Sequence, residues 1–179
     1  MRLATSTHKI INNTWEKLWL KNPMSFPMIN KVVIATWVAS LHTRKWVKDF
    51  NEITSNIKFI TWQHPHTVLS KISISNFKLR EWMPAMLKTT LRKQKAYDFL
   101  YKVATIVMPR VRDFSWLSLK SFDWTWNYTL WLKSYSLFPE LHPDNVTIDV
   151  WLQITITTNV TSNEHIKVLL EWCWFVFNE

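Results

Sequence analysis

Glycine is absent from this chain of 179 residues, whereas tryptophan occurs 13 times. Average usage would give a chain of this length about 12 or 13 glycines. Glycine is the residue that most easily adopts a positive φ angle at turns and helix ends. It also lines the P-loop and the dinucleotide-binding loop, where a side chain would keep the backbone away from phosphate. As written, the sequence therefore excludes both kinds of phosphate-binding loop and leaves positive φ angles to other residues.

The basic residues are concentrated in the first three quarters of the chain. Residues 1–133 hold 21 of the 22 Lys and Arg side chains against seven acids, and residues 134–179 hold Lys167 against six acids. The net charges of the two parts are +14 and −5, in agreement with +9 for the whole chain. This asymmetry favours a polyanionic partner for the basic part. The alternative is a Lys-rich surface that only maintains solubility.

The residue patterns needed for catalysis, metal binding or membrane insertion are missing. Cys173 is the only cysteine, so no disulfide framework is expected. The pair His64 and His66 lacks further metal ligands at a workable spacing. No Ser, Cys or pair of acids stands in a catalytic arrangement, and no stretch of 18 consecutive apolar residues occurs. We therefore expect no enzymatic activity, no metal, no cofactor and no membrane partner.

Hydrophobic periodicity predicts helices and strands that alternate along the chain. The expected helices lie at 10–20, at 46–57, at 97–107 with an end at Pro109, and after a capping box formed by Thr161 and Glu164. The expected strands lie at 28–38, 68–74, 86–91, 128–132 and 146–160. Strands separated by helices, with at least one hairpin-like pair, indicate an α+β fold.

A basic segment at 75–84 joins the strands expected at 68–74 and 86–91, and we expect it to protrude as a long loop. Together with the end of the preceding strand, from Ser70 to Arg80, it combines hydroxyl groups, an amide, an aromatic ring and three cations. Such groups bind phosphate and ribose, and Phe77 could stack on an exposed base. Long ordered loops in compact domains are often functional. A solvated basic hairpin without a partner has the same composition, so the loop by itself leaves both interpretations open.

Six segments of the chain form a recognisable pattern: NFKLREWMP at 76–84, TLR at 90–92, PRVRDFSWLS at 109–118, SFDWTWNY at 121–128, FPE at 138–140 and ITITT at 154–158. These segments resemble the ribosomal protein L5 family, which binds 5S rRNA in the large subunit. The order and spacing match from about Asn22 to the C-terminus. Ser134 and Tyr135 depart from the family pattern, which has a Glu-Gln pair before Phe138.

The resemblance implies a small antiparallel sheet with helices packed on one face, and a role as a structural constituent of the large ribosomal subunit. It implies binding to 5S rRNA and large-subunit rRNA in the central protuberance, with a loop at 71–82 that reaches peptidyl-site tRNA. Neighbouring ribosomal proteins, including a small-subunit bridge partner, are further implied partners. The implied rRNA contacts are Asn22, Lys31, Thr36, Gln63, Thr90 and Arg92. The implied tRNA contacts are Lys71, Ser73, Phe77, Lys78 and Arg80.

Organisation and location follow from the same resemblance. We expect an N-terminal helix or arm at 1–21 and one RNA-binding domain at 22–179. A mitochondrial ribosome, with the protein encoded in the organelle, agrees with the many Lys, Ile and Asn residues of an A+T-rich gene. A plastid or a bacterial cytoplasm is the alternative location. The alternative function is a free-standing regulatory RNA-binding module outside the ribosome.

Nine tryptophans fall where the family pattern carries glycine. They are Trp37, Trp62, Trp82, Trp116, Trp124, Trp126, Trp131, Trp151 and Trp174. This coincidence leads to the hypothesis that most or all of the 13 Trp are glycines whose codon was misassigned, with UGA as the obvious codon. The rival hypothesis is a Trp-rich protein that stacks nucleic-acid bases on its indoles.

Overall fold

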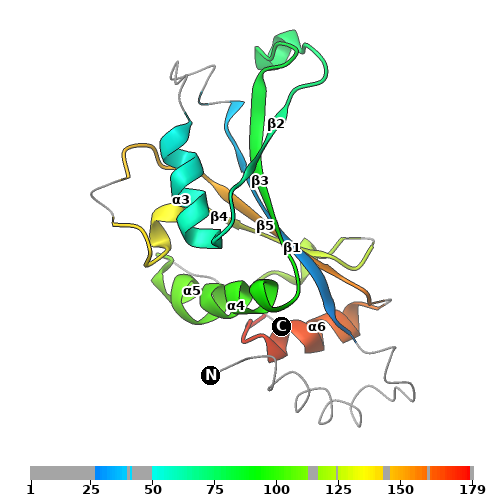
Figure 1. Ribbon diagram of the computed structural model, residues 1–179. Coiled ribbons are helices and arrows are strands. Elements are labelled where there is room, and N and C mark those ends of the chain that lie inside the picture. Colours follow the sequence, from blue (N-terminus) through cyan, green and yellow to red (C-terminus); the bar gives the residue numbers. More distant parts are fainter. Residues whose placement is uncertain are drawn as a thin grey trace. The chain divides into compact units, whose positions relative to one another are not determined.

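The fold contains one five-stranded sheet together with helices (Figure 1). The computed structural model describes residues 27–39, 41, 50–112, 117–123, 125–142, 146–160 and 162–177. The strands are β1 (Ile29–Trp37), β2 (His66–Leu69), β3 (Pro84–Leu91), β4 (Tyr128–Leu132) and β5 (Leu152–Thr158). The helices are α3 (Asn51–Thr61), α4 (Gln94–Lys102), α5 (Met108–Arg110) and α6 (Asn163–Trp172). The strand order is β2-β3-β1-β5-β4. The predicted α+β class with an antiparallel sheet is confirmed.

The strands agree with the sequence prediction where hydrophobic alternation is clear. Strand β4 has the predicted bounds, and in β5 Leu152, Ile154 and Ile156 are buried in alternation with half-buried residues. Strand β5 is shorter than predicted because residues before it bind side chains instead of a neighbouring strand. The N–H of Thr147 and the carbonyl of Ile148 are both engaged in this way. The strand predicted at 68–74 is wrong at both ends, because β2 begins at His66 and ends at Leu69, where its register with β3 shifts.

Helix α4 continues through a π-helical turn, Val103–Val107, into α5. The prediction that Pro109 ends this helix is therefore wrong by one residue, because helical backbone extends to Arg110. Proline has no N–H for the residue four positions earlier, and its ring would collide with that carbonyl group. A π turn is one way to accommodate this clash. In that turn the N–H of Met108 bonds to the carbonyl of Val103.

Of the first and last predicted helices, only the last lies within the described residues. The helix expected at 10–20, and with it the arm at 1–21, lies outside the described residues. Helix α6 is capped by Ser162, whose side chain accepts a hydrogen bond from the N–H of His165 at 3.5 Å. The cap therefore lies one residue after Thr161, the residue predicted for it. No described helix is both long enough and apolar enough to cross a membrane.

The chain forms two compact units, and strands β1, β3, β4 and β5 each have residues in both. The first unit comprises residues 1–32, 91–129 and 155–179, and the second comprises residues 33–90 and 130–154. In the first unit, buried apolar residues come from α4, the π turn and α6, such as Leu100, Val103 and Ile166. In the second, the predicted apolar face of α3 is buried through Ile53 and Ile57. Removal of these side chains from water stabilises each unit.

Candidate nucleic-acid interface

The connection between β2 and β3, residues 70–83, is called the basic loop here, and it belongs to the second unit. Two backbone hydrogen bonds close its base, from the N–H of Ser70 to the carbonyl of Met83 at 2.8 Å and from the N–H of Trp82 to the carbonyl of Ser70 at 2.9 Å. Further along, Ile74 and Leu79 exchange two bonds of 3.0 and 3.1 Å. The loop therefore has an ordered backbone of its own.

The tip of the basic loop is a tight turn. Residues Ser75–Phe77 form one 3₁₀ turn, and Lys78 ends it with a φ of 53° and an N–H bonded to the carbonyl of Ser75 at 2.9 Å. A non-glycine residue with positive φ is uncommon and usually occurs where the surrounding structure fixes it. The Ser73 hydroxyl oxygen accepts the N–H of Glu81 at 3.0 Å. This bond leaves the hydroxyl proton of Ser73 available to an acceptor.

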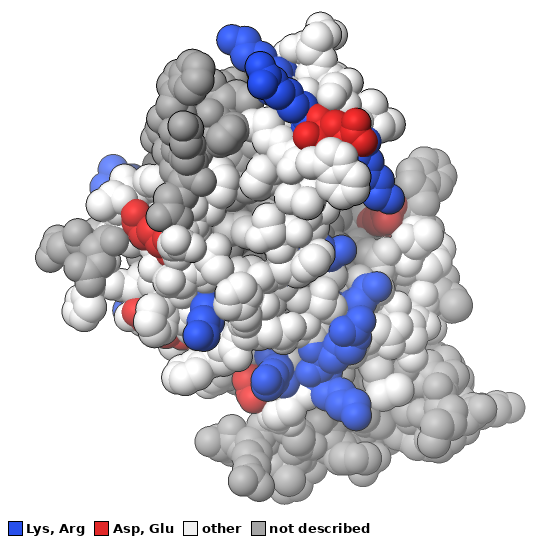
Figure 2. Space-filling view, turned by 45° about the horizontal axis from the view of Figure 1, so that its top comes forward, with Lys and Arg blue, Asp and Glu red and all other residues white. Residues whose placement is uncertain are grey.

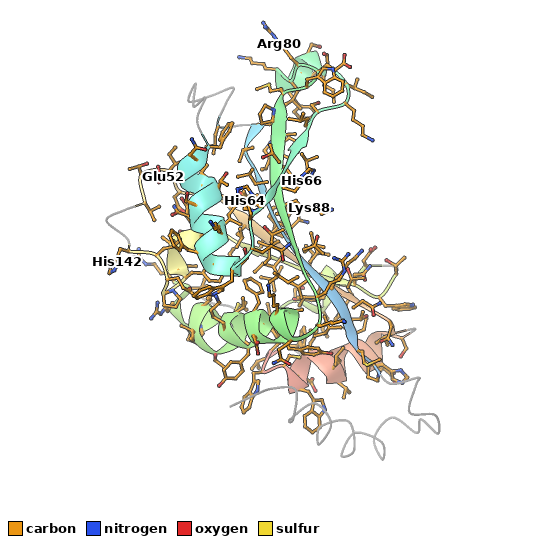
Figure 3. All side chains as sticks on the ribbon, in the orientation of Figure 1. Glu52, His64, His66, Arg80, Lys88 and His142 are labelled. Carbon is orange, nitrogen blue, oxygen red and sulfur yellow. The ribbon has the colours of Figure 1, made fainter. Side chains whose placement is uncertain are left out.

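The basic loop carries cations that are free to bind an anion. Lys71, Lys78 and Arg80 are exposed, and among the described residues none of them forms an ion pair. The ring of Phe77 is 69% exposed. Arg80 lies at the end of the hairpin and points away from it (Figure 3). Basic side chains with an acidic one beside them stand near the top of the view in Figure 2. All five residues predicted for tRNA contact thus lie together in one exposed loop.

The six residues predicted for rRNA contact are not brought together in the same way. Asn22 lies outside the described residues. Lys31 is half-buried on β1, and Arg92 is exposed just after β3; both belong to the first unit. Gln63, which is exposed, and Thr90, which is half-buried, belong to the second unit.

Thr36 is the exception, because the structure gives it a different role. Its side chain is 2% exposed, and its hydroxyl donates a hydrogen bond of 2.7 Å to the carbonyl oxygen of Trp151. The hydroxyl is therefore used inside the second unit, and the prediction of a direct rRNA contact by this side chain is corrected. Side chains on a strand point alternately to the two faces of the sheet, and only the structure shows which face Thr36 occupies.

Two polar residues on the hairpin, His66 and Lys88, were not predicted as part of an RNA-binding face. His66 on β2 lies directly opposite Lys88 on β3, and both are exposed (Figure 3). Residues directly opposite each other in an antiparallel pair share one face of the sheet. The alternation of Lys88 with buried Leu87 and Thr89 was the signal that could have found this face.

Of the two residues that depart from the family pattern, Tyr135 belongs to the interior of the second unit, whereas Ser134 is half-buried. Tyr135 is fully buried, and its hydroxyl donates to the carbonyl of Ile148 at 2.7 Å and accepts from the amide of Asn56 at 3.1 Å. Burial raises the pKa of this phenol. Tyr135 therefore has a packing role in this chain.

The remaining titratable groups show no catalytic arrangement among the described residues. No group of three or more His, Cys, Asp or Glu side chains is close enough there to hold a metal ion. Burial raises the pKa of the Cys173 thiol to about 12, so it stays protonated at neutral pH. Arg110 and Arg112 are exposed, and Asp113 lies outside the described residues.

Comparisons with known proteins agree with the resemblance in the sequence. The model for the C-terminus of the ribosomal L5 family matches residues 84–177. The large ribosomal subunit protein uL5 of Halothermothrix orenii is 35% identical over 171 residues, which cover 96% of this chain and 94% of the relative. The uL5 protein of Aster yellows witches'-broom phytoplasma is 41% identical over 151 residues, 84% of this chain and 82% of the relative. That of Lactobacillus acidophilus is 38% identical over 155 residues, 87% of this chain and 85% of the relative. The chain therefore belongs to the ribosomal L5 family, whose proteins are structural components of the large ribosomal subunit and not enzymes.

Proposed function

We propose that this structural constituent of the large ribosomal subunit binds 5S rRNA in the central protuberance and contacts peptidyl-site tRNA through the basic loop. The observation that carries the tRNA contact is the exposed loop, in which Lys71, Lys78 and Arg80 have no ion-pair partner among the described residues. Phosphate groups neutralise such cations with release of counterions, which makes binding favourable and dependent on salt. The exposed ring of Phe77 adds a surface on which a base can stack.

The proposed rRNA contacts are those predicted residues that remain available, together with Asn22, which the structure does not describe. They are Asn22, Lys31, Gln63, Thr90 and Arg92. A polar or basic side chain at these positions can donate hydrogen bonds to phosphate and ribose oxygens. Large-subunit rRNA, neighbouring ribosomal proteins and a bridge partner on the small subunit complete the proposed set of partners. A division into an arm at 1–21 and a domain at 22–179 is part of the same proposal.

The compartment is also a proposal. The mitochondrial matrix remains our first prediction for the location of this ribosome, with a plastid or a bacterial cytoplasm as the alternative. The relatives named above come from bacteria, which supports the bacterial alternative. Fractionation of the source cells decides between them, because a mitochondrial protein sediments with mitochondrial markers, a plastid protein with plastid markers, and a bacterial protein stays with the cytosol.

The tRNA contact is tested by the double substitution Lys78→Ala and Arg80→Ala in ribosomes that carry this protein. We expect the affinity for tRNA in the peptidyl site to fall by roughly tenfold, with a salt dependence lower by about one phosphate contact for each cation removed. The matched control is Lys120→Ala with Lys133→Ala, which removes two exposed cations outside the basic loop.

The composition of the purified particles separates the two proposed contacts. Particles with the loop variant should keep normal amounts of 5S rRNA, because the proposed rRNA residues are unchanged. Loss of 5S rRNA from these particles would contradict this division of roles. An equal loss of tRNA affinity in the control would assign the effect to net charge instead of the loop.

A further inference from the structure

Among the residues that the structure describes, positive φ angles occur mostly at tryptophan. Six described residues have a positive φ, and four of them are Trp62, Trp82, Trp126 and Trp174, with φ of 54°, 64°, 59° and 68°. Only a few per cent of non-glycine residues adopt such angles, and Asn, Asp and His are the residue types enriched among them. Nothing in an indole side chain favours this conformation, whereas glycine adopts it without steric cost.

Two of the four residues occupy the position after a helix at which glycine is most common. Trp62 ends α3 in the left-handed conformation, and its N–H bonds to the carbonyl of Lys58 at 2.8 Å. After α6, the N–H of Trp174 bonds to the carbonyl of Glu171 at 3.0 Å, and the next N–H bonds to Leu170 at 3.1 Å. The second pattern is a Schellman motif with Trp174 at the position that usually carries glycine.

The other two residues lie in turns with the same requirement. Trp82 is the third residue of a four-residue turn closed by the N–H of Met83 and the carbonyl of Arg80 at 3.3 Å. A positive φ at that position is the requirement that places glycine in type II turns. Trp126 ends a short hairpin turn in which its N–H bonds to the carbonyl of Asp123 at 3.0 Å. A left-handed residue at the end of such a turn is again usually glycine.

Three of the four indoles are exposed. Trp62, Trp82 and Trp174 are 79%, 74% and 64% exposed, although tryptophan is normally well buried, and Trp126 is half-buried. The indole N–H groups of all four donate no hydrogen bond within the described part of the chain. At positions 62, 82 and 174 the packing thus gives no reason for a large side chain, and at all four positions the backbone conformation favours a residue without one.

We propose that positions 62, 82, 126 and 174 carry glycine in the native protein, because the codon translated as tryptophan specifies glycine in the source organism. The proposal also accounts for a chain of 179 residues without a single glycine. Any other tryptophan written with the same codon is glycine as well. In the basic loop, the change at position 82 leaves Phe77 as the one aromatic ring that can stack on a base.

The rival explanation is a set of indoles that serve as a platform for nucleic-acid bases. Such platforms place successive aromatic rings along one binding groove. The four residues instead lie after helices and in turns, two in each unit of the chain. Their common property is the backbone conformation, which a stacking function does not require.

Mass spectrometry of the protein purified from the source cells tests the proposal directly. We expect an intact mass below the 21.6 kDa of the printed sequence, and proteolytic peptides with glycine at positions 62, 82, 126 and 174. Tryptophan in the peptide that covers any one of these four positions would overturn the proposal. This measurement is independent of RNA binding, so its result does not depend on the proposed function.

Thermal unfolding of recombinant chains tests the backbone argument separately. The chain as printed is compared with single variants Trp62→Gly, Trp82→Gly, Trp126→Gly and Trp174→Gly. Each variant should raise Tm by about 2–4 °C, because each relieves a left-handed non-glycine residue. The control is Trp172→Gly, at the end of α6, where glycine should lower Tm. A decrease in Tm at the four positions like that of the control would contradict the backbone argument.

Discussion

Thr36 and Arg92 show how differently two residues of one predicted set can be used. The hydroxyl of Thr36 is buried and bonded to the carbonyl of Trp151, whereas the side chain of Arg92 is exposed after β3. A buried hydrogen bond stabilises the fold, and its loss leaves a polar group without a partner. An exposed cation contributes little to stability but can bind phosphate.

Substitution of Thr36 by Val is expected to destabilise the protein without a change in RNA binding. The variant keeps the side-chain shape but removes the donor to the carbonyl of Trp151, so the free energy of unfolding should fall by about 1 kcal/mol. Urea unfolding and a binding assay with 5S rRNA provide the two measurements. Arg92→Ala serves as the control with the opposite expected result: its free energy of unfolding should be unchanged and its affinity for 5S rRNA should be lower. If the Thr36→Val protein had normal stability but bound 5S rRNA weakly, the result would support the original prediction that Thr36 contacts rRNA directly.

At the scale of elements, helix α3 is fixed to the segment before β5 by a side chain. The carboxylate of Glu52, in the first turn of α3, accepts hydrogen bonds from the hydroxyl of Thr147 and from its N–H, the latter at 2.9 Å. The hydroxyl bond is the main cause that lowers the pKa of Glu52 below its usual value. This contact, and not a strand ladder, determines the path of the chain before Leu152.

Thr147→Ala should therefore have an effect that depends on pH. At pH 7 we expect the free energy of unfolding to fall by about 0.5–1 kcal/mol, a modest value because both groups are accessible to solvent. A carboxyl group whose pKa is lower in the folded protein stabilises the fold at pH values above its pKa in the unfolded chain. This stabilisation is lost as pH falls through the pKa of the group in the folded protein. The difference between variant and parent should thus shrink as pH falls through the lowered pKa of Glu52, as measured by urea unfolding at pH 7 and over a series of acidic pH values. In a Glu52→Gln background, which removes the charge, a pH-dependent difference that persisted would argue against this account.

At the scale of the whole molecule, the resistance of binding to high salt separates a ribosomal component from a free RNA-binding module. Both would bind RNA at low salt, because residues 1–133 have a net charge of +14. At about 1 M salt the Debye length falls to about 3 Å, and attraction between exposed charges is largely screened. A protein held within the subunit by many packed contacts remains bound under these conditions.

Sedimentation of cell extracts at high salt provides the corresponding measurement. We expect this protein to sediment with the large ribosomal subunit at about 1 M salt, where screening removes purely electrostatic complexes. A known weakly bound RNA-binding protein in the same gradient serves as the control and should stay near the top. Recovery of this protein at the top with that control would favour the free-standing module.

The strands with strict alternation were the part of the fold that the sequence predicted best. Strand β4 has the predicted bounds, and the apolar face of α3 is buried as its spacing indicated. The less accurate predictions share a physical cause. The start of β5 depends on the hydrogen-bond partners of Thr147, and the end of α5 depends on the π turn before Pro109. Neither feature produces a hydrophobic periodicity that can be recognised in the sequence.

The sequence by itself indicated the family through the resemblance of its motifs, the α+β class through hydrophobic periodicity, and the group of tRNA-contact candidates through the composition of one loop. The basic loop needed no tertiary information, since all its predicted residues are close together in the chain. Only the tertiary structure decided that Thr36 is internal and that four tryptophans occupy left-handed positions. Burial and φ angles are set by how distant segments pack and turn, and a list of residues does not contain them. The absence of glycine could be counted in the sequence, but the structure showed where glycine is needed.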